Sequence, residues 1–279
     1  MIMNMFETSK VVEIFLKYDI SNNKDETAYF IKELEGITNH SFIVEVDGKQ
    51  FVLRIPGDNP DEINRNAEKN NTLLVQELEL TLPYLVFDEV SGVKISEYFE
   101  IYTYKESDFL NEQLRNAAFL SLKKLHNSDL NFMENFSPLK VFRNLADSQN
   151  SLEIEAVEVG NNIVAKLKEI GLQRKPCHQD LYSGNFVIYK DKTFLIDWEY
   201  SSLGDPYFDY ADLFWQNEID DENLQGRYLK ELGFSKTEEI TKFKLFQTLS
   251  MITWGLWAKR KSPFDNKGDE ALLKAIKNK

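Results

Sequence analysis

Apolar residues alternate with polar ones in the first third of the chain and recur every three or four positions after about residue 108. Alternation predicts strands. It is clearest over 42–46 and 50–54, which flank Asp47-Gly48, a pair typical of two-residue hairpin turns. A second hairpin is predicted over 85–98, and helices are predicted over 11–18 and 60–80.

Helical spacing dominates the remainder of the chain. Leu114, Ala118, Leu122 and Leu125 form one stripe, a second over 163–170 stops at Gly171, and a third helix is predicted over 243–257. A short hairpin is expected over 186–196, around Asp191. This order predicts the α+β class, with an N-terminal lobe over 1–98, a helical lobe over 99–279 and a cleft between them.

Composition narrows the possible partners. The 33 Lys+Arg against 46 Asp+Glu leave a net charge of −13, which disfavours a nucleic acid polymer and suits a cationic small molecule. No apolar run predicts a membrane span or a signal peptide, so a cytoplasmic location is expected. The single cysteine, Cys177, excludes an intrachain disulfide; a small apolar filler is favoured over a nucleophile at this position.

The most specific pattern is His178-x-Asp180-x-x-x-x-Asn185, followed by an apolar run that ends at Asp197. An aspartate that receives a hydroxyl proton, then an asparagine and a second aspartate that hold Mg²⁺, are the groups that phosphoryl transfer from ATP requires. Each residue alone could cap a turn, but their combination favours catalysis by Asp180 and metal binding by Asn185 and Asp197. His178 is interpreted as a hydrogen-bonded scaffold of the loop rather than an acid or a metal ligand.

The segment from His178 to Phe214, through Asp197-Trp198-Glu199-Tyr200-Ser201-Ser202 and Gly204-Asp205-Pro206-Tyr207-Phe208-Asp209, resembles the choline/ethanolamine kinase family. This family lies within the aminoglycoside-phosphotransferase-like kinases. Together with Trp254-Gly255-Leu256-Trp257, the segment is most similar to the bacterial choline kinases. The resemblance covers about residues 33 to 260 and implies a two-lobed protein-kinase-like fold, with a small β-rich N-lobe and a larger helical C-lobe.

The resemblance also implies a nucleotide site. The loop before the second strand would cover the phosphates, Arg54 would hold them while paired with Glu68, and the connector between the lobes would bind adenine through its backbone. A purely structural Arg54–Glu68 pair is the alternative. Asp209 resembles the buried aspartate that holds the catalytic loop in place in this family. The implied nucleotide-binding residues are Thr38, Asn39, Arg54, Glu68, Glu97, Tyr98 and Phe99.

The acceptor site is predicted on the last long helix. On the helix predicted over 243–257, Trp254 projects away from the apolar face. Trp257 lies between the direction of Trp254 and that apolar face. These tryptophans could pack against another helix, but beside a phosphotransfer site they can enclose a quaternary ammonium together with Tyr200. Related kinases tend to have an acidic residue where this chain has Gln216. Glu218 could take the place of that missing acidic residue. Glu199 could balance the acceptor's charge or belong to the scaffold.

The leading hypothesis is therefore an ATP- and Mg²⁺-dependent kinase that converts choline to phosphocholine. Ethanolamine, an aminoglycoside or another small alcohol is the alternative acceptor, although a primary ammonium favours acidic hydrogen-bond acceptors over aromatic faces. A catalytically silent homologue that binds nucleotide or choline is the alternative outside enzymes. The joint presence of Asp180, Asn185 and Asp197 argues against it.

Overall fold

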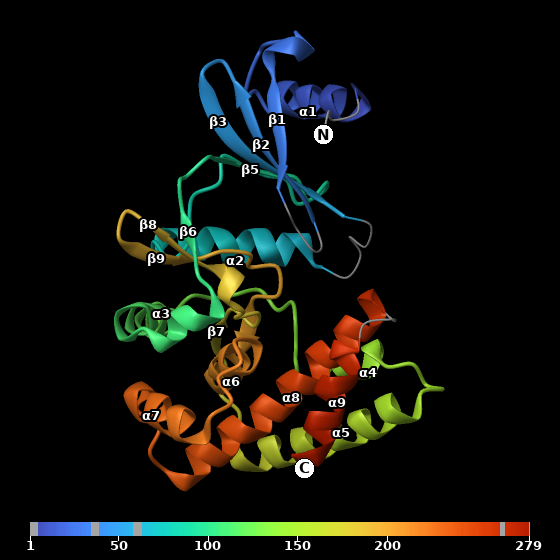
Figure 1. Ribbon diagram of the computed structural model, residues 1–279, viewed down its shortest axis with the longest axis vertical. Coiled ribbons are helices and arrows are strands. Elements are labelled where there is room, and N and C mark those ends of the chain that lie inside the picture. The colour runs from blue at the N-terminus through green and yellow to red at the C-terminus, as the bar shows by residue number, and fades with distance from the viewer. Residues whose placement is uncertain (1–4, 35–38, 58–62, 263–265, 279) are drawn as a thin grey trace.

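The computed structural model describes residues 5–34, 39–57, 63–262 and 266–278. A small antiparallel sheet with one helix across it lies at one end of the molecule, and a larger helical part lies at the other (Figure 1). The predicted α+β, two-lobed kinase-like class is confirmed. None of the helices within these ranges is long and apolar enough to cross a membrane.

The smaller part is a five-stranded sheet in the order β1-β2-β3-β5-β4. Asp47 and Gly48 have positive φ angles of 54° and 71°, which confirms the turn predicted between β2 and β3. Phe15 on the first helix packs edge-on against Phe51 of the sheet, at 5.6 Å between ring centroids. The elements are α1 (Met5–Lys17), η1 (Glu26–Ala28), β1 (Phe30–Leu34), β2 (Asn39–Val46), β3 (Lys49–Pro56), α2 (Arg65–Glu77), β4 (Val86–Phe87) and β5 (Lys94–Glu97).

Short strands link the sheet to the helical part. After β5 the chain forms β6 (Tyr102–Thr103), which pairs antiparallel with β8 (Phe186–Tyr189). The predicted hairpin of β8 and β9 (Lys192–Leu195) is confirmed, with Lys190 and Asp191 both at positive φ. β7 (Lys175–Cys177) pairs with β10 (Ser202–Gly204), and η4 (Ser183–Asn185) lies between β7 and β8. These strands surround the segment that carries the catalytic motif.

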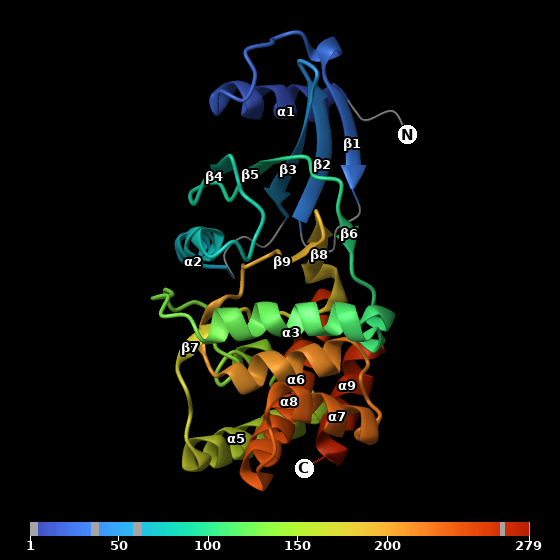
Figure 2. The same ribbon diagram turned by 90° about the vertical axis from the view of Figure 1, so that its left-hand side faces the viewer.

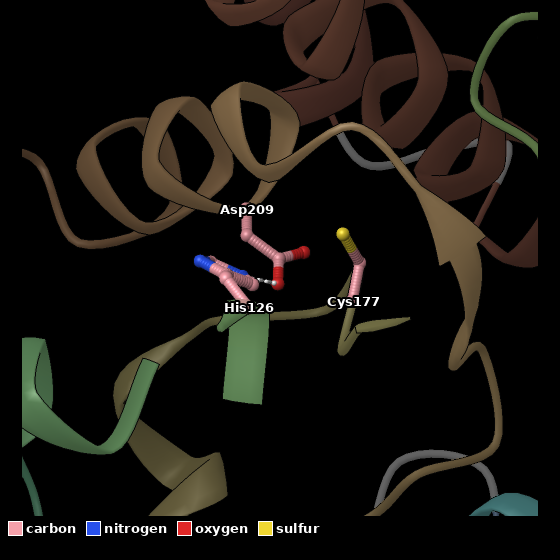
Figure 3. Close-up of side chains that lie close together, drawn as sticks. All are labelled: His126, Cys177 and Asp209. Atoms are coloured by element: carbon pink, nitrogen blue, oxygen red, sulfur yellow. Dashed lines mark hydrogen bonds and ion pairs between the residues drawn. The ribbon is translucent and has the colours of Figure 1, made fainter. Parts of the chain in front are cut away.

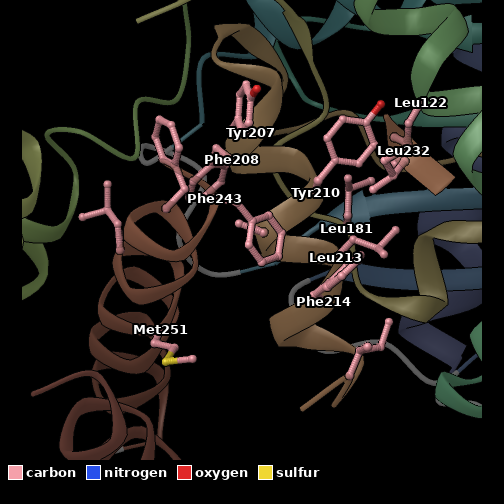
Figure 4. Packing of buried hydrophobic residues seen from close by; sticks show 14 of the residues in the cluster. Leu122, Leu181, Tyr207, Phe208, Tyr210, Leu213, Phe214, Leu232, Phe243 and Met251 are labelled. Carbon is pink, nitrogen blue, oxygen red and sulfur yellow. The ribbon is translucent and has the colours of Figure 1, made fainter. Parts of the chain in front are cut away.

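The helical part is built around α6, with α3 above it and α8 below it in Figure 2. Tyr207, Phe208, Leu213 and Phe214 on α6 join Phe243 of α8 in one hydrophobic cluster (Figure 4). The elements are η3 (Glu106–Leu110), α3 (Glu112–His126), α4 (Phe142–Leu145), α5 (Ser151–Ile170), α6 (Pro206–Gln216), α7 (Glu222–Leu232), α8 (Thr237–Lys261) and α9 (Lys267–Lys277).

The two parts have separate hydrophobic clusters, but the boundary between them does not coincide with one position in the chain. Val75, on α2, and Leu80, just after it, belong to the larger cluster although both precede residue 98. The end of α2 therefore packs against the helical part. The division of the chain into 1–98 and 99–279 stays a prediction.

Candidate active site

Asp180 lies on the loop between β7 and β8, where two amide groups hold its carboxylate. Nε2 of Gln216 donates to Oδ1 at 2.9 Å, and Nδ2 of Asn185 donates to Oδ2 at 3.2 Å. Burial raises the pKa of Asp180 well above its ordinary range, and the nearby Asp212 carboxylate raises it further. An aspartate fixed in this way, with its proton affinity increased, is suited to accept a proton from a bound hydroxyl.

Asn185 is oriented by the same loop. Its Nδ2 also donates to the backbone carbonyl of Asp180, at 2.9 Å. The side-chain oxygen of Asn185 therefore points away from Asp180. The backbone carbonyl of Asn185 accepts from the amide of Ile196 at 3.0 Å, which brings Asp197 to the same site. Two residues separated by a hairpin in the sequence thus become neighbours.

Asp197 follows β9 with a φ of 64°, a strained conformation for a residue other than glycine. Its Oδ2 accepts from Arg54 at 2.6 Å, whereas its buried Oδ1 has no hydrogen-bond partner among the described residues. Burial alone would raise the pKa of Asp197, but the Arg54 and Lys94 cations lower it to about 2. An anionic buried oxygen without a partner fits an Mg²⁺ ligand, because Mg²⁺ prefers carboxylate and amide oxygens.

Glu68 differs from the predicted arrangement. Both of its oxygens are bonded to other cations: Oε1 accepts from Lys94 on β5, and Oε2 accepts from Arg65 at 2.8 Å. Lys94 lies directly opposite Arg54 in the β3–β5 ladder, so the sheet presents two cations side by side. The expected ion-pair partner of Glu68 is therefore wrong, because Lys94 and Arg65 bond its carboxylate. Arg54 reaches across to Asp197.

Glu199 lies beside these cations. It is 3% exposed, and its Oε2 is 3.8 Å from a guanidinium nitrogen of Arg54 and equally far from one of Arg65. Burial and the adjacent Asp197 raise the pKa of Glu199 to about 7. These contacts fit the scaffold alternative for Glu199 better than a position against the acceptor.

The other predicted nucleotide residues lie along the edge of the sheet and the connector. Thr38 falls outside the described residues, and Asn39 is the first residue of β2. Glu97 ends β5, and the amide of Tyr98 donates to the Gln50 carbonyl at 2.9 Å. That N–H is thus used by the sheet, which leaves the connector after Tyr98 to supply backbone groups. Phe99 packs edge-on against Tyr189, at 4.9 Å between centroids.

Three predicted acceptor residues, Tyr200, Trp254 and Trp257, join Phe136, which was not predicted, in one group that we call the aromatic wall. Trp254 stacks on Phe136 at 5.7 Å with an interplanar angle of 7°, and its centroid is 5.4 Å from Tyr200 and 6.0 Å from Trp257. The indole nitrogen of Trp254 donates to Asp212 at 2.7 Å. Electron-rich faces grouped in this way attract a desolvated organic cation.

Gln216 contacts Asp180 rather than the aromatic wall. Besides Asp180, its Nε2 donates to Oδ2 of Asp212 at 2.9 Å. Glu218, considered as a replacement for the missing acidic residue, is exposed. Asp212, fully buried one helical turn before Gln216, is the carboxylate that lies in this part of the site.

Asp209 lies beside His126 and Cys177 (Figure 3) and holds the start of the catalytic loop. Its carboxylate accepts from the amides of His178 and Gln179, at 2.9 and 2.8 Å, and from Nε2 of His126 at 2.8 Å. Nε2 of His178 contacts the Ile196 carbonyl at 2.9 Å, which ties this loop to the strand before Asp197. Cys177 is fully buried beside the cluster, and burial raises the pKa of its thiol well above the ordinary value.

We expect Asp209→Ala to destabilise the fold by about 3–5 kcal/mol, because it leaves two buried amides and a buried imidazole without an acceptor. The free energy of unfolding from urea titration measures the effect. Asp108→Ala is the matched control: this partly exposed carboxylate also accepts bonds, from the Tyr102 hydroxyl and the Lys105 amide. A loss no greater than that of the control would contradict the bracing role of Asp209.

Several site residues were absent from the sequence interpretation, namely Arg65, Lys94, His126, Phe136 and Asp212. Lys94 had a usable signal, because the second predicted hairpin sets it on a strand and lysine is a common ion-pair partner of glutamate. Asp212 follows Asp209 by three residues, a spacing that would place both on one face if the segment were helical. Phe136 lies in a segment without periodicity, and nothing in the sequence indicates its contact with Trp254.

Comparison with known proteins agrees with this geometry. The phosphotransferase enzyme family matches residues 31–243. Protein LicA of Haemophilus influenzae is 32% identical over 254 residues, which are 85% of this chain and 75% of that protein. The crystal structure of the choline kinase LicA from Streptococcus pneumoniae has a TM-score of 0.81, covers 99% of both chains and is 23% identical. A structure of LicA in complex with AMP has a TM-score of 0.79, with 97% of each chain covered and 24% identity.

The two solved structures establish the fold, and the match to the family establishes the kind of enzyme. That match covers most of the chain and includes the catalytic loop, Asp197 and Asp209. The resemblance to choline kinases inferred from the motifs of the sequence is confirmed by these relatives. The chain belongs to the phosphotransferase enzyme family.

Proposed function

We propose that this protein transfers the γ-phosphoryl group of ATP to the hydroxyl of choline. The observation that carries the proposal is the joint arrangement of the base Asp180, the partnerless Asp197 oxygen and the aromatic wall. The similarity to a choline kinase supports the same acceptor. The products are phosphocholine and ADP.

Asp180 acts on the acceptor. Its carboxylate takes the proton as the O–H bond breaks, while the choline oxygen attacks the γ-phosphorus and the bond to the bridging oxygen of ADP breaks. The amides of Gln216 and Asn185 keep the carboxylate in one orientation during this step. Most of the catalytic effect then comes from positioning and charge compensation.

Asn185 and Asp197 are the residues that would hold Mg²⁺, which supplies charge neutralisation on the phosphate oxygens when it is bound. The side-chain oxygen of Asn185 and the partnerless Oδ1 of Asp197 fit this ion. Arg54 orients Asp197 by its hydrogen bond to Oδ2. Arg54 and Lys94 together also provide a cationic face of the sheet toward the phosphates.

The nucleotide lies between the sheet and the catalytic loop in this proposal. Asn39, the first residue of β2, would contact the phosphates together with Thr38, and Glu97, Tyr98 and Phe99 would lie on the adenine side. The complex of a similar LicA protein with AMP supports nucleotide binding in this fold. A cytoplasmic location, where ATP is abundant, stays a prediction.

The trimethylammonium group of choline binds against Tyr200, Trp254 and Trp257. A quaternary ammonium has no N–H to donate, so aromatic faces suit it better than carboxylates. Ethanolamine would need hydrogen-bond acceptors, but the buried Asp212 carboxylate already accepts four hydrogen bonds. The wall therefore favours choline over a primary amine.

The first experiment measures ADP release with ATP and Mg²⁺ in the presence of choline, ethanolamine, an aminoglycoside or no acceptor. We expect strong stimulation by choline and little by the others, because only choline matches the aromatic wall. Stimulation by another acceptor alone would overturn the choice of acceptor and keep the kinase. Choline binding without any turnover would favour the silent homologue.

A further inference from the structure

Asp212 joins three elements of the active site through one buried carboxylate. Its Oδ2 accepts from the amide of Leu181, in the catalytic loop, at 2.8 Å, and from Gln216 at 2.9 Å. Its Oδ1 accepts from the Ser250 hydroxyl at 2.6 Å and from the Trp254 indole at 2.7 Å, both on α8. One group thus bonds the loop that carries the base and the helix that carries the aromatic wall.

Gln216 extends this connection to the base itself. Its Nε2 is 2.9 Å from Oδ1 of Asp180 and 2.9 Å from Oδ2 of Asp212. A side-chain amide has two N–H donors, so one can serve each carboxylate. An ionised carboxylate here could donate to neither and would add a third negative charge beside Asp180 and Asp212.

This geometry accounts for a glutamine at position 216. With Asp212 buried one turn earlier on α6, the position next to the base requires a donor rather than another acceptor. Gln216 and the neighbouring Asp212 carboxylate therefore act together. A glutamine that only filled space would not need two charged partners at hydrogen-bond distance.

We propose that Asp212 and Gln216 are positioning residues that hold the base Asp180 and the acceptor wall at Trp254 in one fixed arrangement. The inference rests on the proposed kinase activity and deepens it. The hydroxyl and the ammonium of choline are ends of one small molecule, so the distance between base and wall must match it. The hydrogen bonds of Asp212 set that distance, because they end on the loop that carries the base and on the helix that carries the wall.

Gln216→Met tests the bridge, since it keeps the length of the side chain and removes both donors. We expect kcat to fall about 10-fold or more, as for loss of a hydrogen bond to a charged group, with the acceptor KM changed less than about twofold. Gln247→Met is the matched control: it makes the same change on α8, at a buried amide whose Nε2 has no partner among the described residues. The control should retain its kcat.

Trp254→Phe tests the other end, because phenylalanine keeps an aromatic face and loses the indole N–H. If both residues act through Asp212, the fold-decrease in kcat of the double variant is smaller than the product of the fold-decreases of the two single variants. Losses that multiply, or a Gln216→Met variant with unchanged kcat, would overturn the inference. These kinetics use whichever acceptor supports turnover by the unaltered enzyme.

Hydrogen exchange of the 178–185 loop gives a readout that needs no acceptor. We expect Gln216→Met and Trp254→Phe to exchange faster in this loop than the Gln247→Met protein, since the Leu181 amide bonds to the loosened Asp212. Equal exchange in all three proteins would overturn the inference. Absence of turnover by the unaltered enzyme with every acceptor would instead reject the proposed function, and the exchange result would still decide the network.

Discussion

Asp180→Asn is expected to lower kcat by about 10²–10⁴-fold, the contribution typical of a positioned general base. The variant keeps the side-chain oxygen that accepts from Gln216 at 2.9 Å, so the loop should retain its conformation. It loses the negative oxygen that takes the proton of the acceptor hydroxyl. Steady-state kinetics with choline measure the effect, and calorimetric titration should give a nucleotide affinity within about twofold of the original enzyme.

The matched control for this variant is Asp191→Asn, which makes the same change in the exposed turn between β8 and β9. The control should retain its kcat because Asp191 lies outside the site. If Asp180→Asn also kept its kcat, the assignment of the base would be wrong. If nucleotide binding fell along with turnover, Asp180 would instead belong to the metal or nucleotide site.

Asp197→Asn should cause the second large loss. The variant removes the negative charge that neutralises Arg54 and would bind Mg²⁺ through the partnerless Oδ1. Because such a metal supplies several kcal/mol of charge stabilisation, we expect kcat/KM for ATP to fall by about 10²–10³-fold. The original enzyme should bind ATP more tightly with Mg²⁺ than with EDTA, and the variant should lose most of that difference.

Asp88→Asn is the control, since Asp88, in the turn after β4, bonds Tyr18 and Ser91 and none of the residues assigned to the metal. It should show the Mg²⁺ dependence of the original enzyme. A full Mg²⁺ effect in Asp197→Asn would mean that the metal has other ligands. Glu68 and Glu199, whose carboxylate oxygens lie within 4.8 Å of those of Asp197, would then be the next residues to test.

Patterns local in the sequence were the ones that predicted structure well. The turn at Asp47-Gly48, the β8–β9 hairpin and the end of α5 at Gly171 depend on a few neighbouring residues, and all three are present. The spacing from Asp180 to Asn185 also acts within one loop, and their side chains contact each other. Such features require no knowledge of distant segments.

Pairings between distant segments were predicted less well. Arg54 was expected to bond Glu68, but strand pairing sets Lys94 beside Arg54, and Lys94 reaches Glu68. Two cations of similar length compete for one carboxylate, and only their positions in the sheet decide between them. Phe136 and Asp212 were missed for the same reason, because their importance depends on which helix packs against them.

The sequence by itself determined the order of the elements and the class of reaction, and it supplied the three residues to which we assign the chemistry. It could do so because hydrophobic periodicity, turn residues and a closely spaced motif act over short stretches of chain. The tertiary structure decided which cation faces Asp197, which carboxylate holds Trp254 and that Gln216 reaches Asp180. Those outcomes depend on distances across the fold, where residues about 40 to 140 positions apart in the sequence compete for the same buried partners.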